Sequence, residues 1–221
     1  MPDHSIQKPI PYYEQFYHSI KQMIFSGEFK PGDRINETQL AKSFNVSKSP
    51  VREAIRVLER EGLLIVDDKS KVRVYQPTHK DVREIYQCRQ ALEPFAVALT
   101  TERANDQQIG ELEQLLQETA VAIQKENTAE DLINLNETFH LKLVTYCENS
   151  RLQKQIDDLH SLIYLFRVYN LTGLNRAKVI LEQHQEVFKY IKAQDKQKAA
   201  DAMFRHLQSD LDHLLMLLSQ T

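Results

Sequence analysis

The sequence is short of long apolar runs, of cysteine and of glycine. No apolar stretch in its 221 residues approaches the roughly 18 residues that a membrane-spanning helix needs, so we expect no membrane contact. Its two cysteines, Cys88 and Cys147, lie far apart within helical patterns. We expect both to be free buried thiols in a reducing compartment, the cytoplasm, and a disulfide between them is the weaker alternative.

The few glycines and prolines divide the chain into two parts. Three of the five glycines lie in the first part, at Gly27, Gly32 and Gly62. Pro77 follows a strand-like run and fits neither a continued strand nor a helix interior. Residues 1–76 hold 12 of the 28 basic and 10 of the 31 acidic residues, so the first part is mildly basic and the second acidic. We therefore predict one domain over residues 1–77 and another over residues 78–221.

The first part has the element order of a winged helix-turn-helix. Its patterns predict a helix ended by Gly27, a short helix capped by Asn36, a tight turn through Asn45, and a helix over "VSKSPVREAIRVLEREG". Two β-branched runs around a polar tip, "LLIVDDKSKVRVY", predict a hairpin. Proteins with this order of elements place the last helix in the major groove of DNA.

The last of these helices predicts a DNA-reading surface. Its apolar stripe of Val51, Ile55 and Leu58 turns Arg52 and Arg56 away from the core. Cations there can meet phosphates and guanine edges, whereas the alternative is a solvated helix whose glutamates balance these charges. The full element order favours DNA binding. Because one helix-turn-helix makes few contacts, we expect a homodimer on a short inverted repeat of operator DNA.

The second part predicts an antiparallel bundle of about six helices, since apolar stripes at helical spacing recur along it and no strand pattern interrupts them. The fold class expected for the whole chain is therefore mainly α, with a winged helix-turn-helix followed by an all-helical domain.

Histidines on these helices are candidates for a metal site. Three of them lie beside apolar residues: His140, His184 and His206. Asn136 precedes His140 by one helical turn, so both side chains leave one face. Facing helices of a bundle can hold a metal, and imidazole suits zinc, nickel, copper or iron. The spacing leaves the alternatives open, because each histidine can make an ordinary core hydrogen bond, and His160 and His213 are equally good candidates.

Motifs for catalysis are missing from the same part. It has no HExxH, no paired ExxH and no His–Asp doublet, and Glu137 points about 100° away from the candidate ligands on an ideal helix. A metal enzyme needs a general acid or base near the ion. We therefore predict that the protein is not an enzyme, and a purely structural metal is one alternative use of the histidines.

The segment "PGDRINETQLAKSFNVSKSPVREAIRVLEREGLL" resembles the DNA-binding domain of the GntR family of bacterial transcription regulators. The resemblance covers residues 10–76 and implies that the operator is contacted by Ser47, Lys48, Ser49 and Arg52. Many members carry arginine where this chain has Thr38, so a base or phosphate contact from the preceding helix is reduced here.

The hairpin tip departs from the family pattern. It is usually basic and contains glycine, but here it reads "DDKSK". Asp67 and Asp68 oppose phosphate, which leaves Lys69 and Lys71 to contact DNA from the wing.

The second part resembles the FCD effector domain of the FadR subgroup, in its shorter VanR-like branch. The markers are "EIYQCRQALEP", "LNETFHLKL" and "EQHQEVFKYIKAQDKQKAADAMFRHL". The resemblance implies a divalent metal ion, zinc or nickel, bound by Asn136, His140, His184 and His206. The usual acid at the first of these positions is aspartate, so Asn136 removes one negative charge.

The resemblance also implies a ligand for this metal. Such sites have open positions that a small carboxylate effector fills, and Arg89 matches an arginine that can pair with the carboxylate as a bidentate fork. Arg89 can equally form an ordinary ion pair with Glu93, four residues further on. We expect a repressor whose operator binding is controlled by this effector. The alternative is a regulator for which the metal ion itself is the signal.

Overall fold

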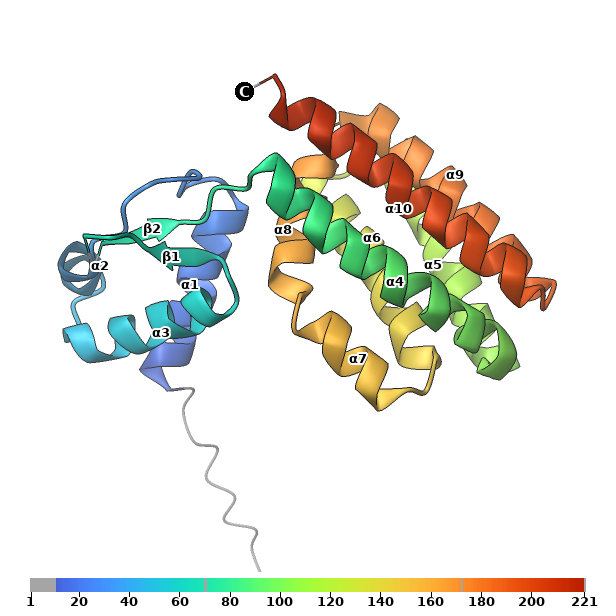
Figure 1. Cartoon of the computed structure of the whole chain (residues 1–221), viewed down its shortest axis with the longest axis horizontal. Helices are drawn as coiled ribbons and strands as arrows, with labels where there is room; N and C mark the ends of the chain where they lie inside the picture. The colour runs from blue at the N-terminus through green and yellow to red at the C-terminus, as the bar shows by residue number, and fades with distance from the viewer. Residues whose placement is uncertain (1–10, 70, 172, 221) are drawn as a thin grey trace, which may run out of the picture. The chain divides into compact units, whose positions relative to one another are not determined.

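The computed structural model describes residues 11–69, 71–171 and 173–220, and the chain forms two compact units, Met1–Pro77 and Thr78–Thr221 (Figure 1). Each unit buries apolar side chains of its own. Within the described residues, no helix combines the length and the apolarity that crossing a membrane requires.

The first unit joins three helices to a small antiparallel sheet. Its elements in chain order are α1 (Tyr12–Phe25), α2 (Glu37–Ser43), α3 (Lys48–Arg60), β1 (Leu64–Val66) and β2 (Val72–Val74). Helices α1 and α3 pack together through buried residues: Phe16, Ile20, Ile24, Val51, Ala54, Ile55 and Leu58. The strands pair Leu64 with Val74 and Val66 with Val72. The winged helix-turn-helix predicted for this part is confirmed.

Short polar residues set the boundaries of its second and third helices. The side chain of Asn36 caps α2 by accepting hydrogen bonds from the backbone N–H groups of Thr38 and Gln39. Asn45, in the turn before α3, has a φ of 54°, which asparagine tolerates better than most residues. Gly62 follows α3 with a φ of 78°, where a side chain would be strained. Asn45 therefore shapes the turn between α2 and α3, and Gly62 allows the chain to turn after α3.

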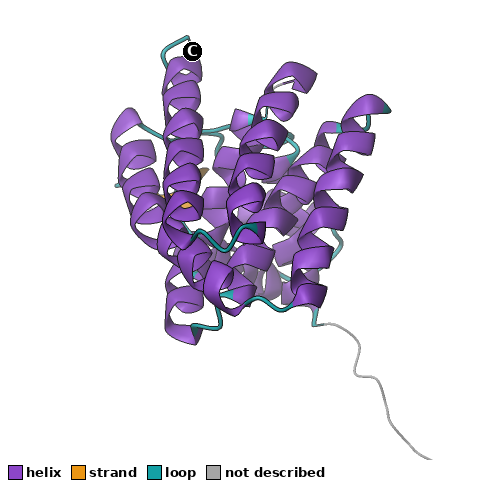
Figure 2. Cartoon of the chain, turned by 90° about the vertical axis from the view of Figure 1, so that its right-hand side faces the viewer, coloured by secondary structure: helices purple, strands orange, loops and turns teal. Residues whose placement is uncertain are grey.

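The second unit is helical throughout its described residues (Figure 2). Its helices are α4 (His79–Arg103), α5 (Asp106–Gln124), α6 (Ala129–Tyr146), α7 (Ser150–Asp157), α8 (His160–Asn170), α9 (Gly173–Lys192) and α10 (Lys196–Leu218). Capping boxes at Thr78, Asn105 and Thr128 begin α4, α5 and α6. Helix α10 lies along both α4 and α9 (Figure 1).

The described part of this unit has seven helices where about six were predicted, because one expected helix is divided into α7 and α8. The chain turns at Asp158 and Leu159, neither of which is a helix breaker. Leu152 and Ile156 of α7 and Ile163 of α8 all enter one apolar cluster. The apolar period therefore continues across the break, and periodicity alone does not reveal it.

The two cysteines are free, as predicted, but only Cys147 is buried. Cys88 is exposed on α4, so that part of the prediction is wrong. The buried stripe of α4 runs through Tyr86, Arg89 and Glu93 instead. Two charged residues thus take the inner face that a pattern of apolar residues was expected to fill.

Candidate metal and effector site, and candidate DNA interface

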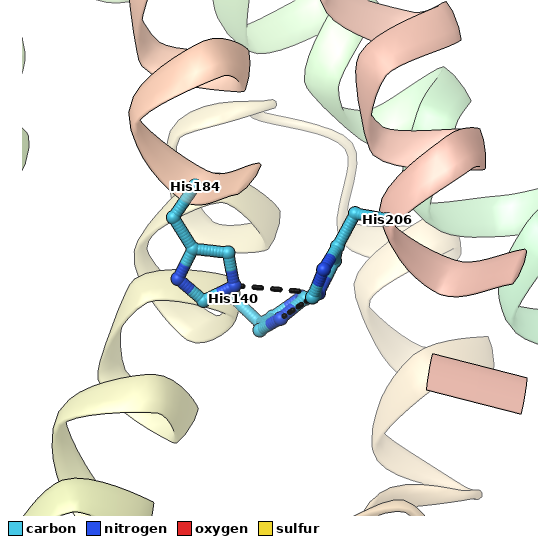
Figure 3. Close-up of side chains that lie close together, drawn as sticks. All are labelled: His140, His184 and His206. Atoms are coloured by element: carbon cyan, nitrogen blue, oxygen red, sulfur yellow. Dashed lines mark hydrogen bonds between the residues drawn. The ribbon is translucent and has the colours of Figure 1, made fainter. Parts of the chain in front are cut away.

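Three histidines from three helices meet in the interior of the second unit. His140 comes from α6, His184 from α9 and His206 from α10, and none is more than 3% exposed. Their rings point toward one another (Figure 3). Nε2 of His206 lies 3.3 Å from Nε2 of His184 and 3.3 Å from Nε2 of His140. The fold therefore gathers three residues that are far apart in the sequence.

The other two candidate histidines lie apart from this trio. His160 is partly exposed and pairs with Glu137 at 2.8 Å. Nδ1 of His213 lies 2.6 Å from Oδ1 of Asn170. Tertiary structure thus separates histidines that periodicity alone had made equivalent.

Hydrogen bonds at the far ring nitrogens orient two members of the trio. Nδ1 of His140 lies 2.7 Å from Oε2 of Glu93, and Nδ1 of His206 lies 2.8 Å from Oε1 of Gln183. The amide nitrogen of Gln183 donates to the Ser209 hydroxyl, which supports this orientation of the amide. Because both partners are acceptors, each Nδ1 carries the proton and each Nε2 keeps its lone pair. These lone pairs converge, and a cation between them would relieve their repulsion.

Burial keeps two members of the trio, His184 and His206, neutral. Burial lowers the pKa of His206 to about 3. Burial, together with the neighbouring His206 and His140 rings, lowers the pKa of His184 well below its usual range. Neutral imidazole is the form that binds metal ions.

The dimensions of the cluster suit a metal ion. Zinc–nitrogen bonds of about 2.0–2.1 Å in a tetrahedron place the ligand nitrogens about 3.3 Å apart. The two Nε2 separations have this value. Asn136 lies one turn before His140 on α6, is buried, and has an Oδ1 atom with no hydrogen-bond partner among the described residues. The spacing of the three histidines therefore fits a divalent ion, and the binding of a metal by these residues and Asn136 stays a prediction.

Arg89 reaches the trio through Glu93. Nε of Arg89 donates to Oε1 of Glu93 at 2.7 Å, and the other oxygen of the same carboxylate accepts from His140. Burial alone would raise the pKa of Glu93, but Arg89 and His140 hold it well below its usual range. Nη1 and Nη2 of Arg89 are buried and find no partner within the described residues. Two alternative roles for Arg89 followed from the sequence, an ion pair with Glu93 and a bidentate contact with a carboxylate. Both are compatible here, because Nε makes the ion pair while Nη1 and Nη2 have no partner among the described residues.

Two further ion pairs lie in the same interior. Arg167 of α8 pairs with Glu137 of α6, and Nη2 of Arg176 on α9 lies 2.5 Å from Oδ1 of Asp210 on α10. The other oxygen of Asp210 lies 3.7 Å from Nε2 of His206. Sequence reasoning missed these charges. A charged residue within an apolar stretch of a helix was the pattern that could have revealed them, and Arg167, directly after Phe166, is an example.

The interior beside the trio is nearly closed. A cavity of about 10 Å³ is lined by Glu93, His140 and Arg167, among other residues. A single water needs roughly this volume. Any larger ligand therefore enters only if the surrounding helices move apart.

In the first unit, the outer face of α3 carries the residues predicted to contact DNA. Those exposed on or just before this helix are Ser47, Lys48, Ser49, Arg52 and Arg56. Thr38, on α2, is partly buried. Nε and Nη2 of Arg52 both donate to Oε2 of Glu37, each at 3.2 Å. This contact orients Arg52 and leaves its remaining N–H groups for an acceptor on DNA.

Hydrogen bonds to Asp67 shape the hairpin tip. Asp67 accepts hydrogen bonds from the backbone N–H groups of Lys69 and Lys71, each at 2.9 Å, and its other oxygen pairs with Arg73. These contacts lower the pKa of Asp67. Asp67 therefore shapes the turn and is paired with a cation, and the repulsion of phosphate by Asp67 and Asp68 stays a prediction.

Two family profiles match the chain. The profile described as "Bacterial regulatory proteins, gntR family" matches residues 12–74, and the FCD domain profile matches residues 84–209. The chain belongs to the GntR family of bacterial regulatory proteins. The recognition made from sequence motifs is thereby confirmed, and this GntR-family protein is a DNA-binding transcription regulator.

Individual relatives extend the likeness along the whole regulator. It is 43% identical over 220 residues to YdhC, an uncharacterized HTH-type transcriptional regulator of Bacillus subtilis (strain 168), covering 100% of this chain and 98% of the relative. It is 26% identical to the HTH-type transcriptional repressor RspR of Escherichia coli (strain K12), covering 90% and 86%. The solved structure of E. coli McbR/YncC matches with a TM-score of 0.76 at 26% identity, covering 96% and 99%.

Proposed function

We propose that this GntR-family regulator is a homodimeric repressor whose operator binding is controlled by a small carboxylate effector bound at a metal site. The metal, zinc or nickel, is held by Asn136, His140, His184 and His206. When bound, the ion supplies open coordination positions for a carboxylate oxygen. The repressor role is supported by the likeness to RspR, which is itself named a repressor. No catalytic step is proposed, since the relatives reported above are transcription regulators.

The observation that carries the proposal is the convergence of three buried imidazoles beside an arginine with an unpaired edge. Buried polar groups normally find partners. Here the Asn136 amide oxygen and the two terminal nitrogens of Arg89 do not, among the described residues. A metal ion satisfies the oxygen, and a carboxylate satisfies the guanidinium as a bidentate partner.

The connection to DNA runs through the helices that hold the site. Three ligand helices, α6, α9 and α10, are tied together at one point, and α4 carries the Arg89–Glu93 pair. Helix α4 begins immediately after Pro77, where the first unit ends. A ligand that binds one arrangement of these helices more tightly than another shifts the population toward it. We propose that this shift alters how the two α3 helices of a dimer meet an inverted repeat.

A direct test begins with protein purified without an affinity tag, because a histidine tag binds metal itself. We expect elemental analysis to find about one zinc or nickel ion per chain, and His184→Ala to remove it. Basal operator binding should survive in this variant, while the effector response is lost. A wild-type protein that takes up no zinc, nickel or manganese at neutral pH would show that the histidines are core residues.

The alternative function is a regulator that senses the metal ion. Titrating operator binding separately with zinc and with small carboxylic acids distinguishes the two. Control by a carboxylate predicts that acids change the affinity of metal-loaded protein for the operator. A response to zinc alone, at free concentrations that change in the cell, favours the alternative.

A further inference from the structure

The buried charges of the second unit form three balanced pairs. Arg89 pairs with Glu93, Arg167 with Glu137, and Arg176 with Asp210. Five of these side chains are almost completely buried, and that of Arg176 is 10% exposed. With neutral histidines, this interior has a net charge close to zero.

A metal ion at the proposed site disturbs that balance. Its four proposed ligands are all neutral, because three are imidazoles and the fourth, Asn136, is an amide. A divalent ion therefore adds two positive charges that no protein ligand offsets. Uncompensated charge in a buried, low-dielectric site is costly, so the ligand that completes the site has to bring negative charge.

Among the described residues, the unpaired buried donors of this interior lie on three helices. On α4 these are Nη1 and Nη2 of Arg89 and the hydroxyl of Tyr86, whose ring lies 4.8 Å from the Arg89 guanidinium. On α8 they are Nε of Arg167 and the amide nitrogen of Asn170, and on α9 it is Nε of Arg176. Arg167 lines the same cavity as Glu93, the partner of Arg89, and the rings of Tyr86 and Phe166 stack 6.4 Å apart between α4 and α8. These donors of α4 and α8 therefore border a shared region.

Arg167 is paired with Glu137 and also lies near the positive charge of Arg89. Burial and the nearby positive charge of Arg89 lower the pKa of Arg167 to about 10. A second anion in this region would stabilise both guanidiniums.

We infer that the effector is a short dianion with two separate acidic groups, of the dicarboxylate class. One group binds the Nη1–Nη2 edge of Arg89 beside the metal, and the other binds Nε of Arg167 and the hydroxyl of Tyr86. Two negative charges offset the two that a divalent ion adds, and two groups satisfy donors that come from different helices. The effector is short because the helices, which enclose a cavity of about 10 Å³, have to move apart to admit it. This inference rests on the proposed function.

The test compares each diacid with its own monoanion. Zinc-loaded, full-length protein is titrated calorimetrically with malonate, succinate and glutarate, with the monomethyl ester of each, and with inorganic phosphate. We expect at least one diacid to bind roughly tenfold or more tightly than its ester, since a charge-assisted hydrogen bond to a buried arginine accounts for that ratio. Esters that bind as tightly as their diacids, or phosphate that binds more tightly than all of them, overturn the inference.

Two variants locate the second acidic group. Tyr86→Phe and Arg167→Gln should each weaken the preferred diacid roughly tenfold, while affinity for its monoester stays the same. Tyr146→Phe is the matched control, because the Tyr146 hydroxyl is already bonded to Glu111 and Lys142. Arg167→Lys, which keeps the charge, guards against a loss of folding in Arg167→Gln. Equal losses for the diacid and the ester in Tyr86→Phe overturn the assignment.

Measuring zinc in the same samples distinguishes a failure of the dianion inference from a failure of the proposed function. Protein that holds zinc but does not discriminate between diacid and ester overturns only the dianion. Protein that holds no zinc, or binds no acid when loaded, overturns the proposed function and the dianion together.

Discussion

Glu93 is the residue through which the candidate metal ligands and the candidate effector residue are connected. One of its oxygens accepts from Arg89 and the other from His140. Residues that accept from the far nitrogen of a ligating histidine fix its ring and raise its basicity. The same carboxylate therefore can pass a change at the Arg89 fork to the ring of His140.

Replacing Glu93 should weaken metal binding without removing any ligand. We expect Glu93→Gln to lower zinc affinity roughly 10- to 100-fold, as is usual when such a supporting acceptor is altered. Competition with a chromophoric chelator measures this, and nitrogen-15 spectra of the histidines report whether His140 loses its Nδ1 proton preference. Glu102→Gln, on the same helix but paired at the surface with Lys196, is the control. Equal zinc affinity in both variants would show that Glu93 does not support His140.

In the first unit, Arg52 is the residue with the most specific predicted role in DNA binding. It is exposed on α3 and oriented by Glu37. If it reads a base, Arg52→Ala should cost roughly 1–3 kcal/mol of specific binding and relax the preference at one operator position. Arg60→Ala, also exposed on α3 but in its last turn, should change affinity less. Electrophoretic titrations on the operator and on single-base variants make the comparison. Operator affinity unchanged by Arg52→Ala would remove Arg52 from the reading surface.

At the scale of elements, the surfaces between helices carry polar contacts that tie the bundle together. Glu111 on α5 accepts from the Lys142 ammonium at 2.6 Å and from the Tyr146 hydroxyl, both on α6. The Lys142 and Tyr146 hydrogen bonds, with a smaller one from Gln107, lower the pKa of Glu111 from 4.5 to about 2. The contacts of Glu111 in the folded protein therefore favour its ionised form over its protonated form.

The resulting pH dependence has a definite sign. Because the folded pKa is below the unfolded one, the contribution of Glu111 to stability is complete above about pH 4.5 and declines as the pH falls toward 2. Glu111→Gln should flatten the fall of the urea midpoint between pH 4.5 and 3, and Lys142→Met should flatten it similarly. Chemical unfolding followed by circular dichroism measures both. A variant that keeps the wild-type slope in this window would contradict the assignment.

At the scale of the whole molecule, the two compact units need not unfold together. A metal that binds only the folded second unit stabilises that unit by about 2.7 kcal/mol when its free concentration is 100 times its dissociation constant. We expect calorimetry to show that zinc raises only the transition of this unit.

A matched pair of variants tests whether this stabilisation comes from the trio. His184→Ala should abolish the zinc-dependent shift, while His213→Ala, a histidine of the same unit bonded to Asn170, should keep it. A zinc response that persists in His184→Ala would mean that the ion binds elsewhere.

Much of the fold followed from local patterns. Gly62 and Asn45 delimit α3, and capping boxes such as the one at Thr78 start the bundle helices, because such residues satisfy backbone groups within a few positions. The break between α7 and α8 did not follow, since no glycine or proline marks it and the apolar period runs through it.

By itself, the sequence determined the family, the order of elements in the first unit, the exposed cations of α3 and the short set of histidines from which a site could be built. These depend on residue type and on spacing within one helix, which neighbouring residues set. Spacing alone left five histidines equivalent, and although the resemblance to the FCD domain singled out three of them, only the tertiary structure shows which ones meet. It placed His140, His184 and His206 together and set His160 and His213 apart. It also placed Glu93 between Arg89 and His140, and left the Arg89 fork without a partner among the described residues. Such contacts join helices far apart in the chain, so they depend on packing that no local period encodes.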